Sequence, residues 1–278
     1  MTLFANFRAG PYGAVCSPYL LDGDAMADPP AMTSVVSGAA PVMLRDRDVI
    51  LATHGFNVSY VSGLRSLSRL EQALALGNND AFLGVLWPGD WILPAINYPF
   101  ENGVASKAGR LLADFINRWL GSARSISLVS HSLGARVVLT AIRGSTRRIR
   151  CACIAAGAVN AGCLTEEFAA ASANCDRIVT LSSRADTVLR FAYPPGDLLA
   201  DVFDPDHKPF EAAIGRDGPR TPWASWVRPC EIPENEDYNH SDYLPPAVVG
   251  EDDANGRWQK SARFMANVLR GQSPTWPG

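Results

Sequence analysis

The stretch that decides the fold is SISLVSHSLGARVVLTAIR, residues 125–143. Its apolar first part, residues 125–130, predicts a buried strand, and residues 135–143 predict a helix. Between them, Ser130, Ser132 and Gly134 form a Ser-x-Ser-x-Gly variant of the Gly-x-Ser-x-Gly turn, in which a strand passes sharply into a helix. Small residues two positions on either side of Ser132 allow strand and helix to approach. The pattern therefore predicts that the Ser132 side chain stands exposed above the end of the strand.

The same alternation of apolar strands and helices extends outward from this stretch. Further strands are predicted at residues 48–53, 82–87, 149–156 and 178–181, and further helices around residues 64–74, 108–119 and 258–269. Such alternation indicates right-handed βαβ units and a mostly parallel sheet with helices on both faces, a three-layer α/β fold. In such sheets ligands bind beyond the carboxyl ends of the strands, so the residues that follow each strand are the first candidates for function.

Length and composition fit one large domain. The chain has 278 residues, 47% of them hydrophobic and 19% charged, which excludes a disordered chain. We therefore expect a single domain over residues 1–278, with loops and one or two edge strands in the first forty-five residues. Residues 191–237 are rich in Pro and Asp and predict an irregular insertion that serves as a lid or wall.

Charge and motifs exclude several classes of partner. The net charge of −3 argues against nucleic acid as a partner. The sequence shows neither a signal peptide nor a stretch of apolar residues long enough for a membrane helix, so we expect a cytoplasmic protein. It also lacks metal-ligand spacing, a Walker loop and a Gly-x-Gly-x-x-Gly motif, so we expect no metal and no cofactor. The sequence leaves the oligomeric state open.

Ser132 is the candidate nucleophile. The turn holds its side chain out of the sheet, and the N-terminus of the following helix lies beside it, where the helix dipole can stabilise a developing negative charge. A serine nucleophile needs a base, and the base needs an orienting carboxylate.

Two further motifs carry a resemblance to a known family. His54-Gly55-Phe56-Asn57 follows the predicted strand 48–53, and Trp87-Pro88-Gly89 ends the strand 82–87. Together with His131-Ser132-Leu133-Gly134, they resemble the α/β-hydrolase superfamily, in particular the poorly characterised DUF900-type hydrolases.

The resemblance assigns roles to several of these residues. It implies that the backbone N–H groups of Phe56 and Leu133 form an oxyanion hole and that His54 shapes the turn. It also implies that Asn57 fixes the turn or adds a side-chain donor. Asn57 and Trp87 are the candidate substrate-binding residues.

The candidate bases are His54, His131, His207 and His240. His131 adjoins Ser132, so its side chain should point away from that of the serine. In the resembling family the catalytic histidine lies on a loop shortly before the final helix, and His240 occupies that place. His207 lies among prolines and charged residues of the insertion and is typical of a solvated surface residue. We therefore expect His240 to be the base, with His207 as the alternative.

The acid should follow a strand after Ser132, because the chain order in this fold is serine, acid, histidine. Asp186 lies a few residues beyond the strand 178–181 and is the expected acid. Asp201, Asp204 and Asp206 are the alternatives within the insertion, and Asp242 is too close to His240 in sequence to reach its ring easily.

These expectations describe a serine hydrolase of carboxylic esters that acts on a small-molecule acyl ester, of acyl length left open by the sequence, through a Ser-His-Asp triad and an acyl-enzyme. Thioesterase, acyltransferase and perhydrolase activities use the same triad and remain alternatives. A binding protein that keeps the fold without catalysis is the alternative from a different class.

Overall fold

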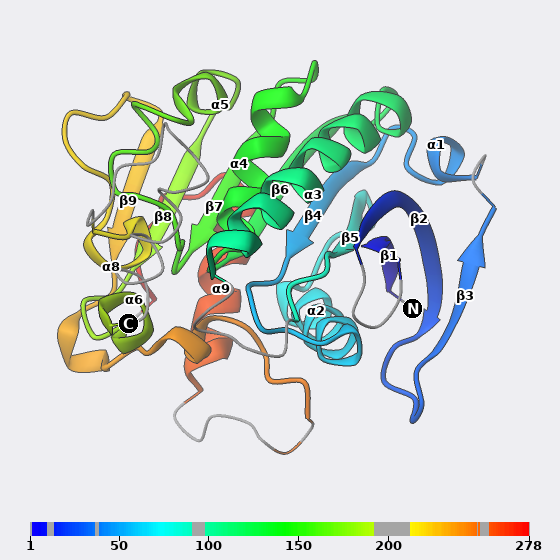
Figure 1. Ribbon diagram of the computed structural model, residues 1–278, viewed down its shortest axis with the longest axis horizontal. Coiled ribbons are helices and arrows are strands. Elements are labelled where there is room, and N and C mark those ends of the chain that lie inside the picture. Colours follow the sequence, from blue (N-terminus) through cyan, green and yellow to red (C-terminus); the bar gives the residue numbers. More distant parts are fainter. Residues whose placement is uncertain are drawn as a thin grey trace.

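The computed structural model describes residues 2–9, 14–36, 39–90, 98–191, 212–248, 250 and 256–277, with the side chains at 98–102 and 191 outside the description. Its strands are β1 (Leu3–Arg8), β2 (Val15–Asp24), β3 (Ala31–Val35), β4 (Asp48–Thr53), β5 (Asp80–Leu86), β6 (Ser125–His131), β7 (Cys151–Ala155), β8 (Ile178–Ser182) and β9 (Val227–Glu231). Within the described residues they form one nine-stranded sheet in the order β3-β2-β1-β5-β4-β6-β7-β8-β9 (Figure 1).

The sheet is mostly parallel. The strands from β1 through β5 and β4 to β9 are all paired in parallel, whereas β2 is antiparallel to both β1 and β3. The β4 and β6 strands run side by side with Thr53 opposite Ser130. Because both strands end within a few residues of this pair, the turns that begin at His54 and Ser132 emerge together at one edge of the sheet.

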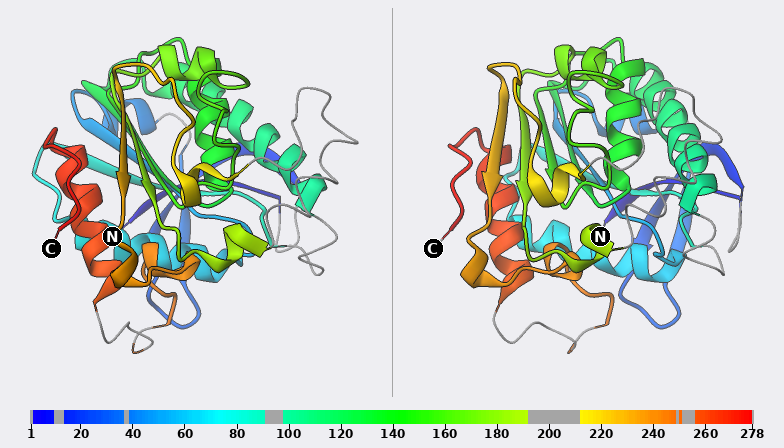
Figure 2. Two further views of the ribbon diagram at one scale, coloured as in Figure 1. Left: turned by 90° about the vertical axis from the view of Figure 1, so that its left-hand side faces the viewer. Right: turned by 60° about the vertical axis from the view of Figure 1, so that its left-hand side comes forward.

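Helices cover both faces. They are α1 (Ala40–Met43), α2 (Tyr60–Leu74), α3 (Tyr98–Trp119), α4 (Gly134–Gly144), α5 (Ala169–Ala173), α6 (Thr187–Phe191), α8 (Ile214–Asp217) and α9 (Arg257–Leu269), with single turns η1 (Glu234–Glu236) and η2 (His240–Tyr243). The α3 and α4 helices pack together on one face, and α2 and α9 pack together on the other (Figure 2). Burial on both sides explains the continuous apolar strands β6, β7 and β8. The predicted three-layer α/β fold is confirmed.

The amino-terminal region differs from the prediction. We expected only edge strands there, but β1 lies inside the sheet between β2 and β5. Asn6 and Arg8 interrupt its apolar pattern, and both are nevertheless buried, with 2% and 1% of their surface exposed. A buried strand can contain polar residues when these form hydrogen bonds inside the protein, and its sequence then lacks the apolar pattern that predicts burial.

The predicted irregular segment 191–237 also needs correction. Residues 192–211, which include His207, Asp201, Asp204 and Asp206, lie outside the described residues. The rest of the segment holds α8 and the edge strand β9, which pairs with β8 from Ile178↔Val227 to Ser182↔Glu231. The strand contains Pro229 and alternates buried with exposed residues, which is typical of a sheet edge and escapes a search for apolar runs.

Across the described ranges, no helix combines the length and the apolar character that crossing a bilayer requires.

Candidate active site

Ser132 lies at the sharp turn between β6 and α4. Its φ of 55° falls in the left-handed region, which residues other than glycine rarely adopt. The Ser132 N–H donates to the carbonyl of Ala155 on the neighbouring strand (3.1 Å), and its own carbonyl accepts from the N–H of Ala135 (3.0 Å). The surrounding backbone thus holds an unfavourable conformation in place, a pattern that concentrates at functional sites.

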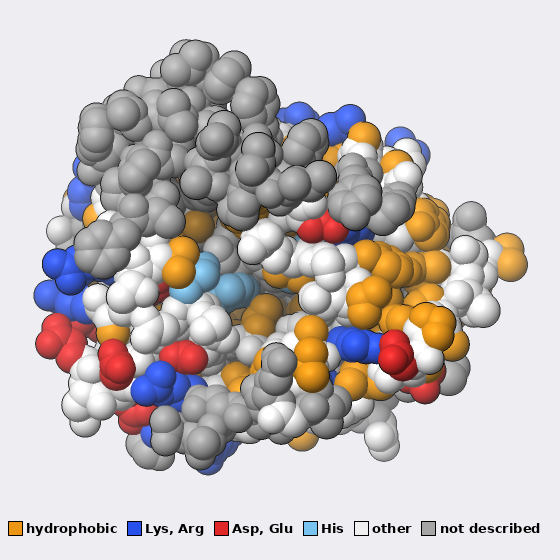
Figure 3. All heavy atoms as spheres, turned by 60° about the horizontal axis from the view of Figure 1, so that its bottom comes forward, with side chains coloured by type: hydrophobic (Ala, Val, Ile, Leu, Met, Phe, Trp, Pro, Cys, Tyr) orange, Lys and Arg blue, Asp and Glu red, His pale blue; other side chains and the backbone are white. Residues whose placement is uncertain are grey.

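Ser132, His240 and Asp186 form one chain of hydrogen bonds. The Oγ of Ser132 is 2.7 Å from Nε2 of His240, and Nδ1 of His240 is 2.7 Å from Oδ2 of Asp186. The carboxylate is completely buried, whereas the His240 side chain is 15% exposed. Because a carboxylate can only accept, Nδ1 of His240 carries the proton, and Nε2 is left to accept from the Ser132 hydroxyl. Histidine side chains reach the surface at this edge of the sheet, in a view from its carboxyl-end side (Figure 3).

Asp186 is held by the backbone that follows it. Its Oδ1 accepts from the N–H of Leu189 at 2.8 Å, which caps the first turn of α6. Nearby, the Ser183 hydroxyl donates to the carbonyl of Tyr238 at 2.8 Å. The segment that carries the acid is therefore bonded directly to the segment that leads into His240.

The turn that carries His240 is fixed by its own cap. At the start of η2, the N–H of Asn239 donates to Oδ2 of Asp242 at 2.7 Å, and Nη1 of Arg257 donates to the same oxygen at 3.1 Å. The Asp242 carboxylate is thus engaged within the turn, whereas the His240 ring faces Asp186.

His131 has contacts that the sequence did not predict. Its Nε2 is 2.8 Å from the carbonyl oxygen of His240, and the two rings lie 4.8 Å apart between centroids. Desolvation and the neighbouring His240 lower the pKa of His131 to about 3, so its ring is neutral near pH 7. The carbonyl must accept, so Nε2 of His131 is the donor. The His131 side chain therefore contacts the segment that carries the candidate base.

Two glycines allow the turn after β4 to lie against Ser132. A Cβ added at Gly55 would lie 2.7 Å from Cβ of Ser132, and one added at Gly134 would lie 2.5 Å from the carbonyl oxygen of His54. Both distances are shorter than the contacts that real Cβ atoms make. The absence of side chains at Gly55 and Gly134 therefore sets how closely the two turns approach each other.

Phe56 and Asn57 follow Gly55 in this turn. Asn57 has a φ of 57°, which asparagine tolerates better than most residues, and its N–H donates to the carbonyl of Gly89 at 2.6 Å. Phe56 is partly buried against the hydrophobic core. The predicted oxyanion donor Phe56 thus lies on the turn beside Ser132, whereas Leu133 directly follows Ser132 in the chain.

His54 and Trp87 hold the turn in place by hydrogen bonds and ring stacking. The Nδ1 of His54 is 2.8 Å from the carbonyl oxygen of Gly55, the N–H of Trp87 donates to Nε2 of His54 at 3.4 Å, and the indole N–H donates to the carbonyl of His54 at 2.9 Å. The rings stack with centroids 5.7 Å apart. Burial lowers the pKa of His54 to about 4, so Nδ1 donates and Nε2 accepts in the neutral ring. Trp87 has none of its surface exposed, which corrects the expectation that it binds substrate.

Replacing Gly55 by alanine tests the predicted oxyanion role of Phe56: we expect kcat for ester hydrolysis to fall by about 10²- to 10³-fold, the loss typical of one misplaced oxyanion donor. The new methyl group would overlap the Ser132 side chain and push the turn away from it. Gly121→Ala is the matched control, because a Cβ there meets nothing within 4 Å. Ester turnover by the two variants is the measurement. A Gly55→Ala enzyme as active as Gly121→Ala would show that the spacing of this turn does not matter.

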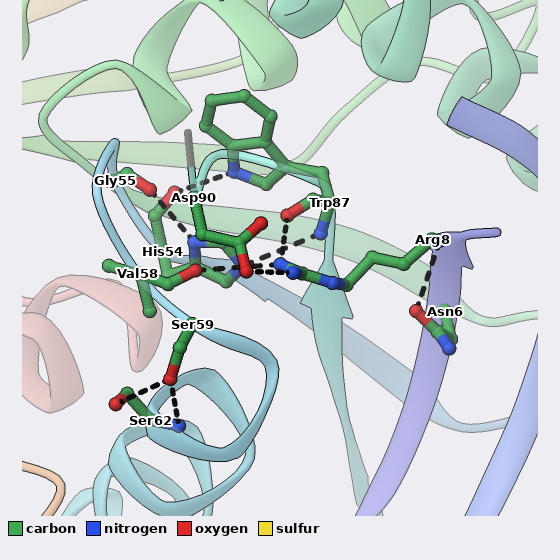
Figure 4. A network of polar contacts seen from close by, with 9 residues as sticks. All are labelled: Asn6, Arg8, His54, Gly55, Val58, Ser59, Ser62, Trp87 and Asp90. Atoms are coloured by element: carbon green, nitrogen blue, oxygen red, sulfur yellow. Dashed lines mark hydrogen bonds and ion pairs between the residues drawn. The ribbon is translucent and has the colours of Figure 1, made fainter. Parts of the chain in front are cut away.

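Arg8 is the centre of a buried polar network next to this turn. Arg8 of β1 reaches Val58, Trp87 and Asp90, whose segments follow β4 and β5 (Figure 4). No sequence motif marks Arg8, because the partners of its guanidinium in Figure 4 lie 50 to 82 residues further along the chain.

The parallel sheet, the left-handed serine between strand and helix, and the glycine turn packed against it define the α/β-hydrolase class of fold. A family model described as "Alpha/beta hydrolase of unknown function (DUF900)" matches residues 41–194, more than half of the chain. The chain belongs to this DUF900 family. The matched range contains Gly55, Ser132 and Asp186, and it ends before His240.

Several solved structures are similar to the chain at low identity. Arabidopsis thaliana SOBER1 is 11% identical, with 81% of this chain and 98% of that chain covered and a TM-score of 0.46. A predicted CIB-like hydrolase from Thermoplasma acidophilum is 12% identical, with 91% and 93% covered and a TM-score of 0.44. A thermophilic esterase from Thermogutta terrifontis is 11% identical, with 97% and 95% covered and a TM-score of 0.43. No protein of curated function matches the sequence.

Proposed function

We propose that the chain is a serine hydrolase that cleaves carboxylic esters of small molecules, with Ser132 as nucleophile, His240 as base and Asp186 as the orienting acid. The observation that carries the proposal is the unbroken chain from Ser132 Oγ through the His240 ring to Asp186, with 2.7 Å at each link. Nucleophile, base and orienting group within hydrogen-bond reach are the geometric signature of nucleophilic catalysis.

The first chemical step follows from the tautomer of His240. As the Ser132 oxygen attacks the ester carbon, its proton passes to Nε2 of His240, and the negative charge of Asp186 stabilises the imidazolium that forms. His240 then gives this proton to the departing alcohol. Asp186 accepts two hydrogen bonds, from His240 and from Leu189, and keeps the ring in the productive orientation.

The charge on the former carbonyl oxygen needs donors at the turn. We assign the backbone N–H groups of Phe56 and Leu133 to this role. The close approach of Gly55 to Ser132 supports the assignment, as does the start of α4 directly after the serine. Water activated by His240 then attacks the acyl-enzyme and regenerates Ser132.

The proposal is tested by labelling with a fluorophosphonate, which reacts with an activated serine. We expect stoichiometric labelling of the wild-type chain, located by mass spectrometry on the peptide that contains Ser132, and no labelling of Ser132→Ala. Equal labelling of both proteins, or none of the wild type, would favour a binding protein that keeps the fold without catalysis.

Assays with different substrates separate the activities that share the triad. One set uses p-nitrophenyl esters of increasing acyl length, and a second set uses acyl thioesters. A third set adds hydrogen peroxide or an acceptor alcohol to the esters. The expected result is highest kcat/KM with a carboxylic ester and water. A clear preference for the thioester, for peroxide or for the alcohol would replace ester hydrolysis by thioesterase, perhydrolase or acyltransferase activity.

A further inference from the structure

Arg8 is a buried charge with no role in the chemistry described so far. Only 1% of its side chain is exposed. A buried charge is strongly unfavourable unless it is paired and hydrogen-bonded. The partners of the guanidinium therefore indicate which segments Arg8 connects. Its Nη1 donates to the carbonyl of Trp87 at 3.0 Å and to that of Val58 at 3.4 Å, and its Nη2 pairs with the carboxylate of Asp90 (Figure 4).

These partners come from two different loops. Val58 closes the loop after β4 that carries Gly55 and Phe56, whereas Trp87 and Asp90 belong to the segment after β5. Arg8 itself belongs to a third strand, β1. One planar guanidinium therefore bridges both loops. Its several N–H donors point in fixed directions and can reach both loops at once, whereas the single ammonium group of a lysine could not.

The loop that carries Phe56 is fixed on both sides of this residue. On one side, His54 is bonded to the backbone and the indole of Trp87. On the other side, Val58 is bonded to Arg8. The positive charge of Arg8 also adds to burial in lowering the pKa of His54, which keeps Nε2 of the histidine available as an acceptor for the N–H of Trp87.

We propose that Arg8 is a positioning residue of the oxyanion hole: it holds the loops after β4 and β5 together so that the Phe56 N–H stays aimed at the substrate oxygen. The inference rests on the proposed hydrolase function and assigns a role to a residue outside the range that the family model matches. Arg8 acts through the loops and touches no reacting atom. Its loss should weaken binding of the transition state more than binding of the ester.

Arg8→Met keeps much of the volume and removes the charge and the donors. Arg136→Met is the matched control, because Arg136 is also buried, with 4% of its side chain exposed, and also pairs with a carboxylate, that of Glu167. The measurements are kcat and KM for a p-nitrophenyl ester, the melting temperature, and the inhibition constant of a trifluoromethyl ketone. In this inhibitor, the Ser132 oxygen bonds to the ketone carbon, the proton moves to His240, and the ketone oxygen becomes an oxyanion.

For Arg8→Met we expect kcat to fall by about 10- to 100-fold, the scale for a displacement near 1 Å, with KM within about threefold of wild type. The affinity for the ketone should fall in parallel with kcat. Arg136→Met should lose melting temperature to a similar degree and keep kcat within about threefold. Arg8→Lys restores the charge without the several fixed N–H donors, so it should give intermediate kcat and ketone affinity.

Arg8→Lys also serves as the test if the methionine variant does not fold, because wild-type kcat and ketone affinity in Arg8→Lys would then overturn the inference. Unchanged kcat and ketone affinity in a folded Arg8→Met, or equal losses in Arg136→Met, would show that Arg8 only stabilises the sheet. A wild-type chain without turnover or label at Ser132 would instead remove the proposed function itself.

Discussion

His240→Ala is expected to lower kcat by about 10⁴- to 10⁶-fold, comparable with loss of the nucleophile, because residues of a triad act as a unit. Without the imidazole, no other side chain among the described residues is hydrogen-bonded to the Ser132 hydroxyl and able to take its proton; the neighbouring His131 uses its Nε2 to bond the carbonyl of His240. Activity on the best p-nitrophenyl ester is the measurement, with folding checked by the melting temperature.

His207→Ala is the control for this prediction, because His207 is the other histidine that the sequence left open as base. It should keep kcat within about threefold of wild type, because its sequence context among prolines and charged residues predicts no part in the chemistry. An active His240→Ala together with an inactive His207→Ala would transfer the role of base to His207.

Asp186→Asn is expected to lower kcat by about 10⁴-fold with little change in KM. Asparagine keeps an oxygen for the N–H of Leu189, so the start of α6 should remain intact. Its NH₂ group, however, would donate to Nδ1 of His240 and force the ring proton onto Nε2. In that tautomer Nε2 cannot accept from Ser132. Steady-state kinetics on the same ester measures the effect.

Asp48→Asn is the control for this substitution. Asp48 also accepts hydrogen bonds from side chains, Arg124 and Ser125, but it lies at the start of β4, at the opposite edge of the sheet. Asp48→Asn should therefore alter stability and leave kcat nearly unchanged. If both variants lose kcat to the same extent, the hydrogen bond from His240 to Asp186 has no particular role in catalysis.

Much of the fold could be predicted from the sequence, because buried parallel strands are continuous apolar runs. The predicted strand at residues 48–53 coincides with β4, and the helix around residues 64–74 lies within α2. The failures were β1 and β9. In β1, Asn6 and Arg8 are polar yet buried, and only their distant partners explain that burial. In β9, exposed positions at the sheet edge and Pro229 interrupt the sequence, so no continuous apolar run is present.

For the candidate site, a local motif located Ser132, and chain order with the family resemblance pointed to Asp186 and His240. The contact of His131 with the carbonyl of His240 could not be predicted, because it joins residues 109 positions apart in the chain. Trp87 was misjudged because an aromatic residue after a strand can face the solvent or support the neighbouring loop. Its stacking on His54 became visible only with the pairing of β4 and β5.

The position of β1 also has a consequence for the order of folding. The pairs β1–β2 and β2–β3 join neighbours in the sequence, so this antiparallel meander can form early and locally, whereas Leu3 of β1 must meet Leu83 of β5 across a long closed loop. The Arg8 side chain becomes buried only when this meander packs against β5, because its partners Trp87 and Asp90 follow that strand. We therefore expect the loop that carries Phe56 to take up its final shape late, in the same step that completes the middle of the sheet.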